Sequence, residues 1–169
     1  GGEPFLNNTL PEFIIEGLKR TQHKFSITSN GYFKKEIERA VESIKTEDRN
    51  RIEFHISIDG TEKTHNKIRR NIRSFQKAVE TIKYLSKQKI NVCINTVAQK
   101  ENLHELAEIK DFFKSISDSI AVSFIPLVTD ISENPQENLY TFAYQSALWD
   151  YAATEIDKKK ILSKGTWGG

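Results

Sequence analysis

Two periods of apolar residues alternate along this chain. In the first, apolar residues recur three or four positions apart, a spacing that places them on one face of a helix. The helices predicted in this way carry apolar stripes at Leu10, Ile14 and Leu18; at Phe33, Ile37, Val41 and Ile44; at Phe75, Val79, Ile82 and Leu85; and at Leu106, Ile109 and Phe113. The first of these helices is predicted to span residues 10–20.

In the second period, apolar side chains occupy every other position, as they do in a strand. The predicted strands are residues 25–28, 52–58, 90–97 and 120–125. Alternation is strictest in the second, where the apolar residues fall on one face and Glu53, His55 and Ser57 fall on the other. We therefore expect this strand to have one apolar face and one polar face.

Helix starts are indicated by residues that can cap a first turn. Thr9 with Glu12, and Asn102 with Glu105, have the spacing of a capping box, in which each side chain bonds the backbone of the other residue. Ser74 can cap the helix that carries the third apolar stripe. Three helices are expected to begin at these positions.

Strands and helices alternate as far as residue 126. Helical connections suit parallel strands, so the pattern predicts an α/β fold, either an open doubly wound sheet or a curved barrel. Beyond Pro126 a polar loop leads into a long helical pattern, a lysine-rich helix end at 158–160 and a loose tail. The predicted division is 1–126 for the α/β part and 127–169 for a C-terminal helical extension with its tail.

Composition narrows the classes of function. At 169 residues, 37% of them apolar, the chain can bury one sizeable core. Its 25 basic and 23 acidic residues are spread along the sequence and leave a net charge of +2, so nucleic acid is not an expected partner. Apolar runs stay far below the roughly 20 residues that span a bilayer, and no signal-peptide pattern opens the chain. We expect a cytoplasmic protein without a membrane partner.

The counts of cysteine and methionine add to this picture. Cys93 is the one cysteine and lies in a predicted strand, so we expect a small buried side chain, no internal disulfide and no metal site made from clustered cysteines. The sequence contains no methionine and begins at Gly1 inside an established pattern. We expect the chain to have been cut from something longer.

Four segments rich in small polar residues are candidates for the carboxyl ends of parallel strands, where ligands bind in such folds. They are Gly1-Gly2-Glu3-Pro4, Thr28-Ser29-Asn30-Gly31, Ser57-Ile58-Asp59-Gly60 and Asn95-Thr96. Paired glycines let a backbone approach a ligand closely, and a glutamate accepts hydrogen bonds from an ammonium group. Taken singly, Asn-Gly and Asp-Gly are common turn formers, so a purely structural interpretation of each stays open.

Taken in order, these segments resemble the radical S-adenosylmethionine (SAM) superfamily. Gly-Gly-Glu-Pro is followed by Thr-x-Asn-Gly, and then by Ser-x-Asp-Gly with His65 and Arg69 behind it. The resemblance covers residues 1–126. Within the superfamily, the chain is most similar to the branch that includes peptide-modifying maturases and anaerobic sulfatase-maturing enzymes. It implies a partial (β/α) TIM-like barrel of parallel strands, truncated at its N-terminus.

The resemblance also implies which residues bind SAM. They are Gly1, Gly2, Glu3 and Pro4 of the first segment, Thr28 and Asn30 of the second, Ser57, Asp59 and Arg69 of the third, and Asn95. The first segment would hold the amino group of the methionine moiety, and Ser57 with Arg69 would hold its carboxylate, which suits a hydroxyl and a permanently charged guanidinium. Asn95 would hydrogen-bond a ribose hydroxyl, unless alternation turns Thr96 inward instead. Asp59 either contacts the ligand or shapes the turn.

Two histidines lie near these segments. His55 shares a strand face with Ser57, so it faces the interior of a barrel if Ser57 does. It is then either a hydrogen-bonded interior residue or a residue that faces substrate. His65 is expected to order the loop that carries Arg69 and not to transfer protons.

The cluster ligands of the family are missing from this sequence. In the family, a Cys-x3-Cys-x2-Cys loop after the first strand binds a [4Fe–4S] cluster that reduces SAM, and the resulting 5′-deoxyadenosyl radical abstracts hydrogen from the substrate. The branch implies a peptide or protein substrate. We expect the first strand, its loop and the second strand to lie upstream of Gly1, and this chain alone to be inactive.

Two other interpretations stay open. The chain could be a non-catalytic barrel fragment or a degenerate copy that cannot bind the cluster. It could also be a generic α/β nucleotide-binding module, although it contains neither a G-x-G-x-x-G nor a Walker A pattern. Residues 127–169 could close the barrel, cover the substrate or bind a partner through aromatic residues such as Trp149 and Tyr151. Substrate identity and oligomeric state are not predicted.

Overall fold

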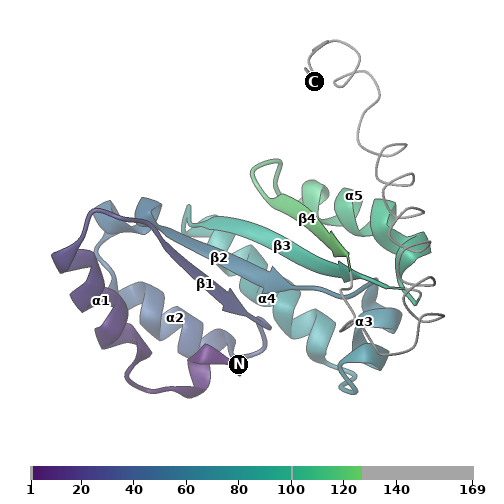
Figure 1. Cartoon of the computed structure of the whole chain (residues 1–169), viewed down its shortest axis with the longest axis horizontal. Helices are drawn as coiled ribbons and strands as arrows, with labels where there is room; N and C mark the ends of the chain where they lie inside the picture. Colours follow the sequence, from purple (N-terminus) through teal and green to yellow (C-terminus); the bar gives the residue numbers. More distant parts are fainter. Residues whose placement is uncertain (1, 100, 127–169) are drawn as a thin grey trace, which may run out of the picture.

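A four-stranded parallel sheet lies at the centre of the computed structural model, which describes residues 2–99 and 101–126 (Figure 1). The strands lie side by side in chain order and are β1 (Phe25–Ser29), β2 (Ile52–Ser57), β3 (Asn91–Ala98) and β4 (Ala121–Pro126). All three strand pairs are parallel. The predicted α/β fold with parallel strands is confirmed.

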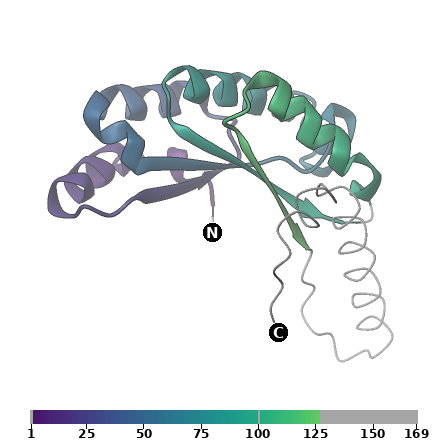
Figure 2. The ribbon, with the colours of Figure 1, turned by 90° about the horizontal axis from the view of Figure 1, so that it is seen from above.

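One helix precedes β1, and the others return the chain between successive strands or join the loops at their ends. They are α1 (Leu10–Arg20), α2 (Lys34–Ser43), α3 (Glu62–Ile68), α4 (Ser74–Lys87) and α5 (Leu106–Ile116), with 3₁₀ turns η1 (Pro4–Leu6), η2 (Thr46–Arg51) and η3 (Leu103–Glu105). Figure 2 shows helices gathered in an arc over one face of the sheet, and no helix of the described residues covers the other face. Helices outside and an uncovered sheet face inside are the arrangement of a partial (β/α) barrel.

Apolar and polar side chains alternate along β2, and the helices cover the face that carries the apolar ones. Ile52, Phe54 and Ile56 are at most 1% exposed and belong to the apolar core beneath the helices. Burying each such side chain contributes roughly 1.5–3 kcal/mol, and a slip of one residue in register would turn the whole set outward. The strict alternation of this strand is therefore confirmed, and it fixes the direction of every side chain on the opposite face.

The opposite face of the sheet is polar near its centre. In register across the strands, the neighbours on this face are Thr28, His55 and Cys93 in one row, and Ser57, Asn95 and Ser123 in the next. Thr96 points the other way and is fully buried on the helix side. Asn95, and not Thr96, therefore shares a face with Ser57.

Helix α1 has the predicted bounds, but its predicted capping box is wrong. Thr9 makes no side-chain bond to the helix, because its backbone is already helical at φ −93° and ψ −1°. Its hydroxyl instead donates to Asn7 Oδ1 at 2.9 Å. Pro11 lies in the first turn, where its missing N–H costs nothing because that turn has no internal acceptor for it.

The other two predicted caps are wrong for a related reason. Ser74 is the first residue of α4 and not its cap, and its hydroxyl lies 3.0 Å from His65 Nε2. Asn102 and Glu105 do not bond each other's backbone as a capping box would, because both side chains reach the loop after β2. In each case a distant partner has replaced the local one.

Some expectations concern residues outside those described. They include Gly1 and the proposed helical extension over 127–169, about which the structure makes no statement. The basic segment after residue 60, which the pattern left without an element, forms the short helix α3. Across residues 2–99 and 101–126, no helix combines the length and apolar character needed to cross a bilayer.

Candidate functional site

A cavity of about 300 Å³ lies at the carboxyl ends of β1 and β2. Its lining residues come from four separate stretches of the chain and are Gly2, Glu3, Thr28, Ser29, Asn30, Ser57 and Arg69. The volume is at the lower end of the range for small-molecule sites. Six of the predicted cofactor-binding residues are thus brought together at one place on the rim of the sheet.

Glu3 supplies the negative charge of this cavity and also ties two segments together. Its Oε1 accepts a hydrogen bond from Ser29 Oγ at 2.8 Å, and its Oε2 accepts one from the Asn30 backbone N–H at 2.7 Å. Oε1 also accepts a longer bond of 3.4 Å from the Phe5 N–H. A carboxylate has about four acceptor positions. Glu3 therefore keeps capacity for a further donor, such as a ligand ammonium group.

Arg69 supplies the positive charge of the same cavity. Its Nε and Nη2 both donate to the carboxylate of Asp59, which is 6% exposed, whereas the Arg69 side chain is 35% exposed. Two of the five guanidinium N–H groups are used in this fork, and three remain for a ligand. Asp59 is therefore the buried support of Arg69, and it does not line the cavity.

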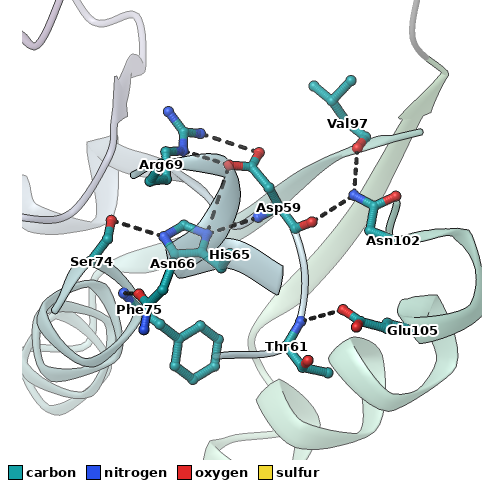
Figure 3. Close-up of polar contacts among 10 residues, drawn as sticks. All are labelled: Asp59, Thr61, His65, Asn66, Arg69, Ser74, Phe75, Val97, Asn102 and Glu105. Atoms are coloured by element: carbon teal, nitrogen blue, oxygen red, sulfur yellow. Dashed lines mark hydrogen bonds and ion pairs between the residues drawn. The ribbon is translucent and has the colours of Figure 1, made fainter. Parts of the chain in front are cut away.

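His65 lies beneath Asp59 and is 1% exposed (Figure 3). Its Nδ1 accepts a hydrogen bond from the Asp59 backbone N–H at 3.0 Å, so Nδ1 carries no proton. The proton of the neutral ring is then on Nε2, which donates to Ser74 Oγ. Burial lowers the pKa of His65 to about 4, against the attraction of the Asp59 carboxylate. The 3.8 Å approach of Nδ1 to Asp59 Oδ2 is consequently not an ion pair at neutral pH.

The environment of His65 agrees with the role expected for it. A neutral ring held on both nitrogens fixes the Asp59 backbone to the start of α4, and so orders the loop that leads to Arg69. Phe75 packs against the ring edge-on, with centroids 5.9 Å apart. This packing excludes water from the ring and accounts for the desolvation that depresses its pKa.

Three predicted residues lie near the cavity without lining it. Pro4 begins η1 directly after Glu3, where its fixed backbone angle sets the path of the chain. His55 and Asn95 lie on the uncovered sheet face and contact each other, with His55 Nδ1 and Asn95 Nδ2 3.2 Å apart. Asn95 is directly opposite Ser57 in register, so this pair lies at and just below the level of the cavity floor.

A polar row continues from that pair across the open face. His55 Nε2 lies 3.4 Å from Glu53 Oε2, and the Cys93 thiol donates to Asn95 Oδ1 at 3.5 Å. Burial raises the pKa of the Cys93 thiol, and the Glu53 carboxylate adds to this. Cys93 is 8% exposed, which confirms the prediction that it is buried.

Sequence reasoning missed three residues of this region. Ser29 lines the cavity and bonds Glu3, whereas the resemblance implied only its neighbours Thr28 and Asn30. Asn102 and Glu105 follow β3 and bond the loop after β2 at Asp59 and Thr61 (Figure 3). Their spacing is that of a capping box, so nothing in the local sequence distinguishes helix capping from bonding to the loop after β2.

The described residues fit an amino acid ligand and do not fit a metal cluster. Opposed carboxylate and guanidinium groups match the ammonium and carboxylate of an amino acid head. Within residues 2–99 and 101–126, no three His, Cys, Asp or Glu side chains gather as metal ligands. An iron–sulfur cluster needs several thiolates, and Cys93 alone cannot supply them.

A larger cavity, of about 670 Å³, lies elsewhere, on the helical side of the sheet. Its lining comes from the start of α3 and from α4 and α5, and includes Phe75, Phe112 and Phe113. Size alone would favour it as a ligand site. The smaller cavity carries paired opposite charges at the carboxyl ends of the strands, which is where parallel α/β folds bind ligands, and we therefore take it as the candidate site.

The fold and the rim define the class: a parallel α/β protein whose charged loops gather at the carboxyl ends of its strands. Comparison with known families then identifies the group. The Radical SAM superfamily matches residues 1–113 of the 169, and the chain belongs to that superfamily. The predicted superfamily is thereby confirmed.

A distant relative supports the narrower branch. A cysteine-type anaerobic sulfatase-maturating enzyme of Clostridium novyi (strain NT) is 33% identical to this chain over 89 residues. The match covers 51% of this chain and 24% of that relative. The chain thus matches about a quarter of the length of the maturase.

Proposed function

We propose that this chain provides the part of a radical SAM enzyme that grips the amino acid head of SAM. The observation that carries the proposal is that Glu3 and Arg69 line the same cavity of about 300 Å³. An isolated carboxylate or guanidinium is common on a protein surface. A carboxylate and a guanidinium facing one small cavity, each held by buried partners, suit a zwitterion.

Each lining residue then has a chemical role. Glu3 accepts a hydrogen bond from the methionine ammonium group, with the Gly2 backbone beside it. The free N–H groups of Arg69 and the hydroxyl of Ser57 donate to the methionine carboxylate. Thr28 and Asn30 complete the wall between them. Asn95 lies on the same sheet face as Ser57 and would take a ribose hydroxyl.

The radical chemistry of the superfamily depends on a [4Fe–4S] cluster, which supplies the electron that cleaves SAM when it is bound. The single cysteine of this sequence does not fit that cluster, so we assign no step to it here. The contribution of these residues is to hold and orient the amino acid head. By analogy with the sulfatase-maturating relative, we propose a peptide or protein substrate. We also propose a cytoplasmic location, because no signal-peptide pattern was recognised in the sequence.

Titration of the chain with SAM, ATP and NAD tests the proposed function. We expect isothermal titration calorimetry or ligand-observed NMR to detect SAM in preference to the other two. Decarboxylated SAM and S-adenosylmethioninol should bind more weakly, because each lacks the carboxylate that Arg69 and Ser57 would hold. Preference for ATP or NAD, or equal binding of SAM and its decarboxylated analogue, would refute the proposal.

The cysteine count favours a second candidate, a SAM-binding module that performs no redox chemistry by itself. Anaerobic iron–sulfide reconstitution separates the two candidates. The chain is compared with a longer version that includes the coding sequence upstream of Gly1, where the three-cysteine loop is expected. The two are compared by visible absorbance and by cleavage of SAM. Cluster absorbance and 5′-deoxyadenosine formation in the extended version alone support the enzyme; their absence from both supports the non-catalytic module.

A further inference from the structure

Glu105 lies at the end of η3, immediately before α5, and its side chain points away from that helix toward another loop (Figure 3). One carboxylate oxygen accepts from the Thr61 backbone N–H at 2.7 Å, and the other accepts from Thr64 Oγ1 at 2.5 Å. The side chain is 12% exposed. A nearly buried carboxylate is thus committed to the first turn of α3, on a different βα unit.

Asn102 makes a second link between the same two loops. Its Nδ2 donates to the Asp59 carbonyl at 2.6 Å and to the Val97 carbonyl at 2.8 Å, while its Oδ1 accepts from the Gln99 N–H at 2.8 Å. The side chain is fully buried. The loop after β2 is therefore fastened at Asp59 and at Thr61 by two residues of the loop after β3.

Gly60 lies between these two fastening points. A Cβ added there would lie 2.7 Å from Glu105 Oε2 and 2.7 Å from Thr64 Cβ and Cγ2, closer than real Cβ atoms come. The glycine of the Ser-x-Asp-Gly segment is thus needed as clearance for Glu105. This close approach shows that the contact is part of how the loop is built and not an incidental surface pair.

We propose that Glu105 is a positioning residue for Arg69, an inference that rests on the proposed binding of a carboxylate ligand at this rim. Thr61 and Thr64 begin α3, and Arg69 follows its end, where its backbone N–H donates to the His65 carbonyl at 2.9 Å. Glu105 holds the start of this short helix and Asn102 holds Asp59, the counter-ion of Arg69. The direction of the guanidinium toward the cavity is therefore set from the neighbouring βα loop.

The substitutions that test this role act on Glu105 and on a matched control. Glu105→Ala removes both acceptors. Glu105→Gln keeps one acceptor oxygen for Thr61, and its amide can donate to the Thr64 hydroxyl, so it should rescue. Glu108→Ala removes an equal charge from an exposed position on α5, the helix that follows Glu105, and serves as the control.

Three measurements on the full chain report the outcome. In Glu105→Ala we expect hydrogen exchange of the Thr61 amide to rise at least about tenfold, which corresponds to the net worth of a charge-assisted bond. We expect the Arg69 Nε–H resonance to shift or broaden. We expect the preference for SAM over decarboxylated SAM to fall about tenfold, while Glu105→Gln stays within about threefold of wild type.

The possible outcomes separate this inference from the proposed function. If the wild-type chain does not discriminate SAM from its decarboxylated analogue, the proposed function fails, and the positioning of Arg69 is still decided by the exchange and resonance data. If Glu105→Ala behaves as Glu108→Ala in all three measurements, the inference is overturned. Should Glu105→Ala not fold, Thr64→Val removes one of the two bonds and is expected to give the same three changes at smaller size; wild-type behaviour there overturns the inference.

Discussion

The two sides of the candidate cavity are built differently. On the side proposed to bind the ammonium group, Glu3 is held by bonds from Ser29, the last residue of β1, and from Asn30, which follows it, and the same carboxylate still has an acceptor position free. On the carboxylate side, Arg69 is held by a separate buried Asp59, which is itself held by other loops. The comparison teaches that an acceptor group can serve fold and ligand together. A guanidinium that must keep N–H groups for a ligand needs a dedicated counter-ion behind it.

The largest difference between the two sides should be found in ligand affinity. Arg69→Ala removes the three N–H groups proposed to donate to the ligand and also the fork to Asp59, and it is expected to weaken SAM binding about 100-fold, because charge-assisted bonds to the methionine carboxylate are lost and Asp59 is left without its partner. Glu3→Gln keeps an acceptor oxygen and is expected to cost about tenfold. Calorimetric titration of both variants checks the order. Arg69→Lys should resemble Ala more than wild type if the fork geometry matters and not merely the charge.

The free energy of unfolding should be sensitive to an added Cβ at Gly60, beside the support of Arg69, and insensitive to one at Gly2, beside Glu3. Gly60→Ala is expected to lower the free energy of unfolding by about 1–3 kcal/mol, because the added Cβ would overlap Glu105 and Thr64. Gly2→Ala meets no atom within 4 Å and should change stability by less than about 0.5 kcal/mol. Urea denaturation of the two variants gives the comparison. Equal stability of both would mean that the clearance beside Glu105 is not needed.

The pH dependence of the folding stability should come in part from His65, which lies beneath Asp59 in the support of Arg69. The pKa of His65 is about 4 in the folded chain and near its ordinary 6.5 when unfolded, so between these values the unfolded chain binds the proton more readily. Stability therefore rises with pH through this window, by at most about 1.4 kcal/mol per pH unit for one group, and the contribution is complete above pH 6.5. His65→Asn should remove this slope in urea melts recorded from pH 4 to 7.

A matched control exists for the histidine. His23 is exposed, and His23→Asn should leave the slope unchanged. If His65→Asn retains the full wild-type slope, other groups account for it, and the buried neutral ring beneath Asp59 is not the cause.

The smallest expected effect belongs to Thr28, which lines the cavity and is itself exposed. Thr28→Val keeps the shape and removes a neutral hydroxyl, so SAM affinity should fall by less than about threefold. Titration against wild type measures this. A loss as large as that of Glu3→Gln would show that the wall contributes as much as the charges, and the comparison of two charged sides would need revision.

The fold followed from the sequence because its signals are periodic and local. Strict alternation placed Ile52, Phe54 and Ile56 on one face, and the structure buries all three. The four helical stripes located α1, α2, α4 and α5, since an apolar face must pack against the core, but the short helix α3 was not predicted and α5 begins at Leu106 and not directly after Asn102. The order of the polar segments was enough to indicate which loops meet, and six of the predicted residues line one cavity.

The supports of the site could not be found in this way. Asn102 and Glu105 have the spacing of a capping box, and only the three-dimensional arrangement shows that their bonds go to Asp59 and Thr61. The sequence does not show whether Gly60 is a glycine because it forms a turn or because a side chain there would collide with Glu105. Long-range hydrogen bonds between loops leave no periodic trace, because each depends on one pair of residues and on the packing that brings them together.

The order of the strands has a consequence for how the chain acquires its site. Each strand pairs with its immediate predecessor, so during synthesis every new βα unit meets a neighbour that has already emerged from the ribosome. The contacts of Glu3 with Ser29 and Asn30 need only the first 30 or so residues. Those that fix Asp59 and Thr61 wait until Asn102 and Glu105 have been made. The contacts of Glu3 can thus form early, and the loop that carries Asp59 and Arg69 is fastened only when the third strand and the loop after it are in place.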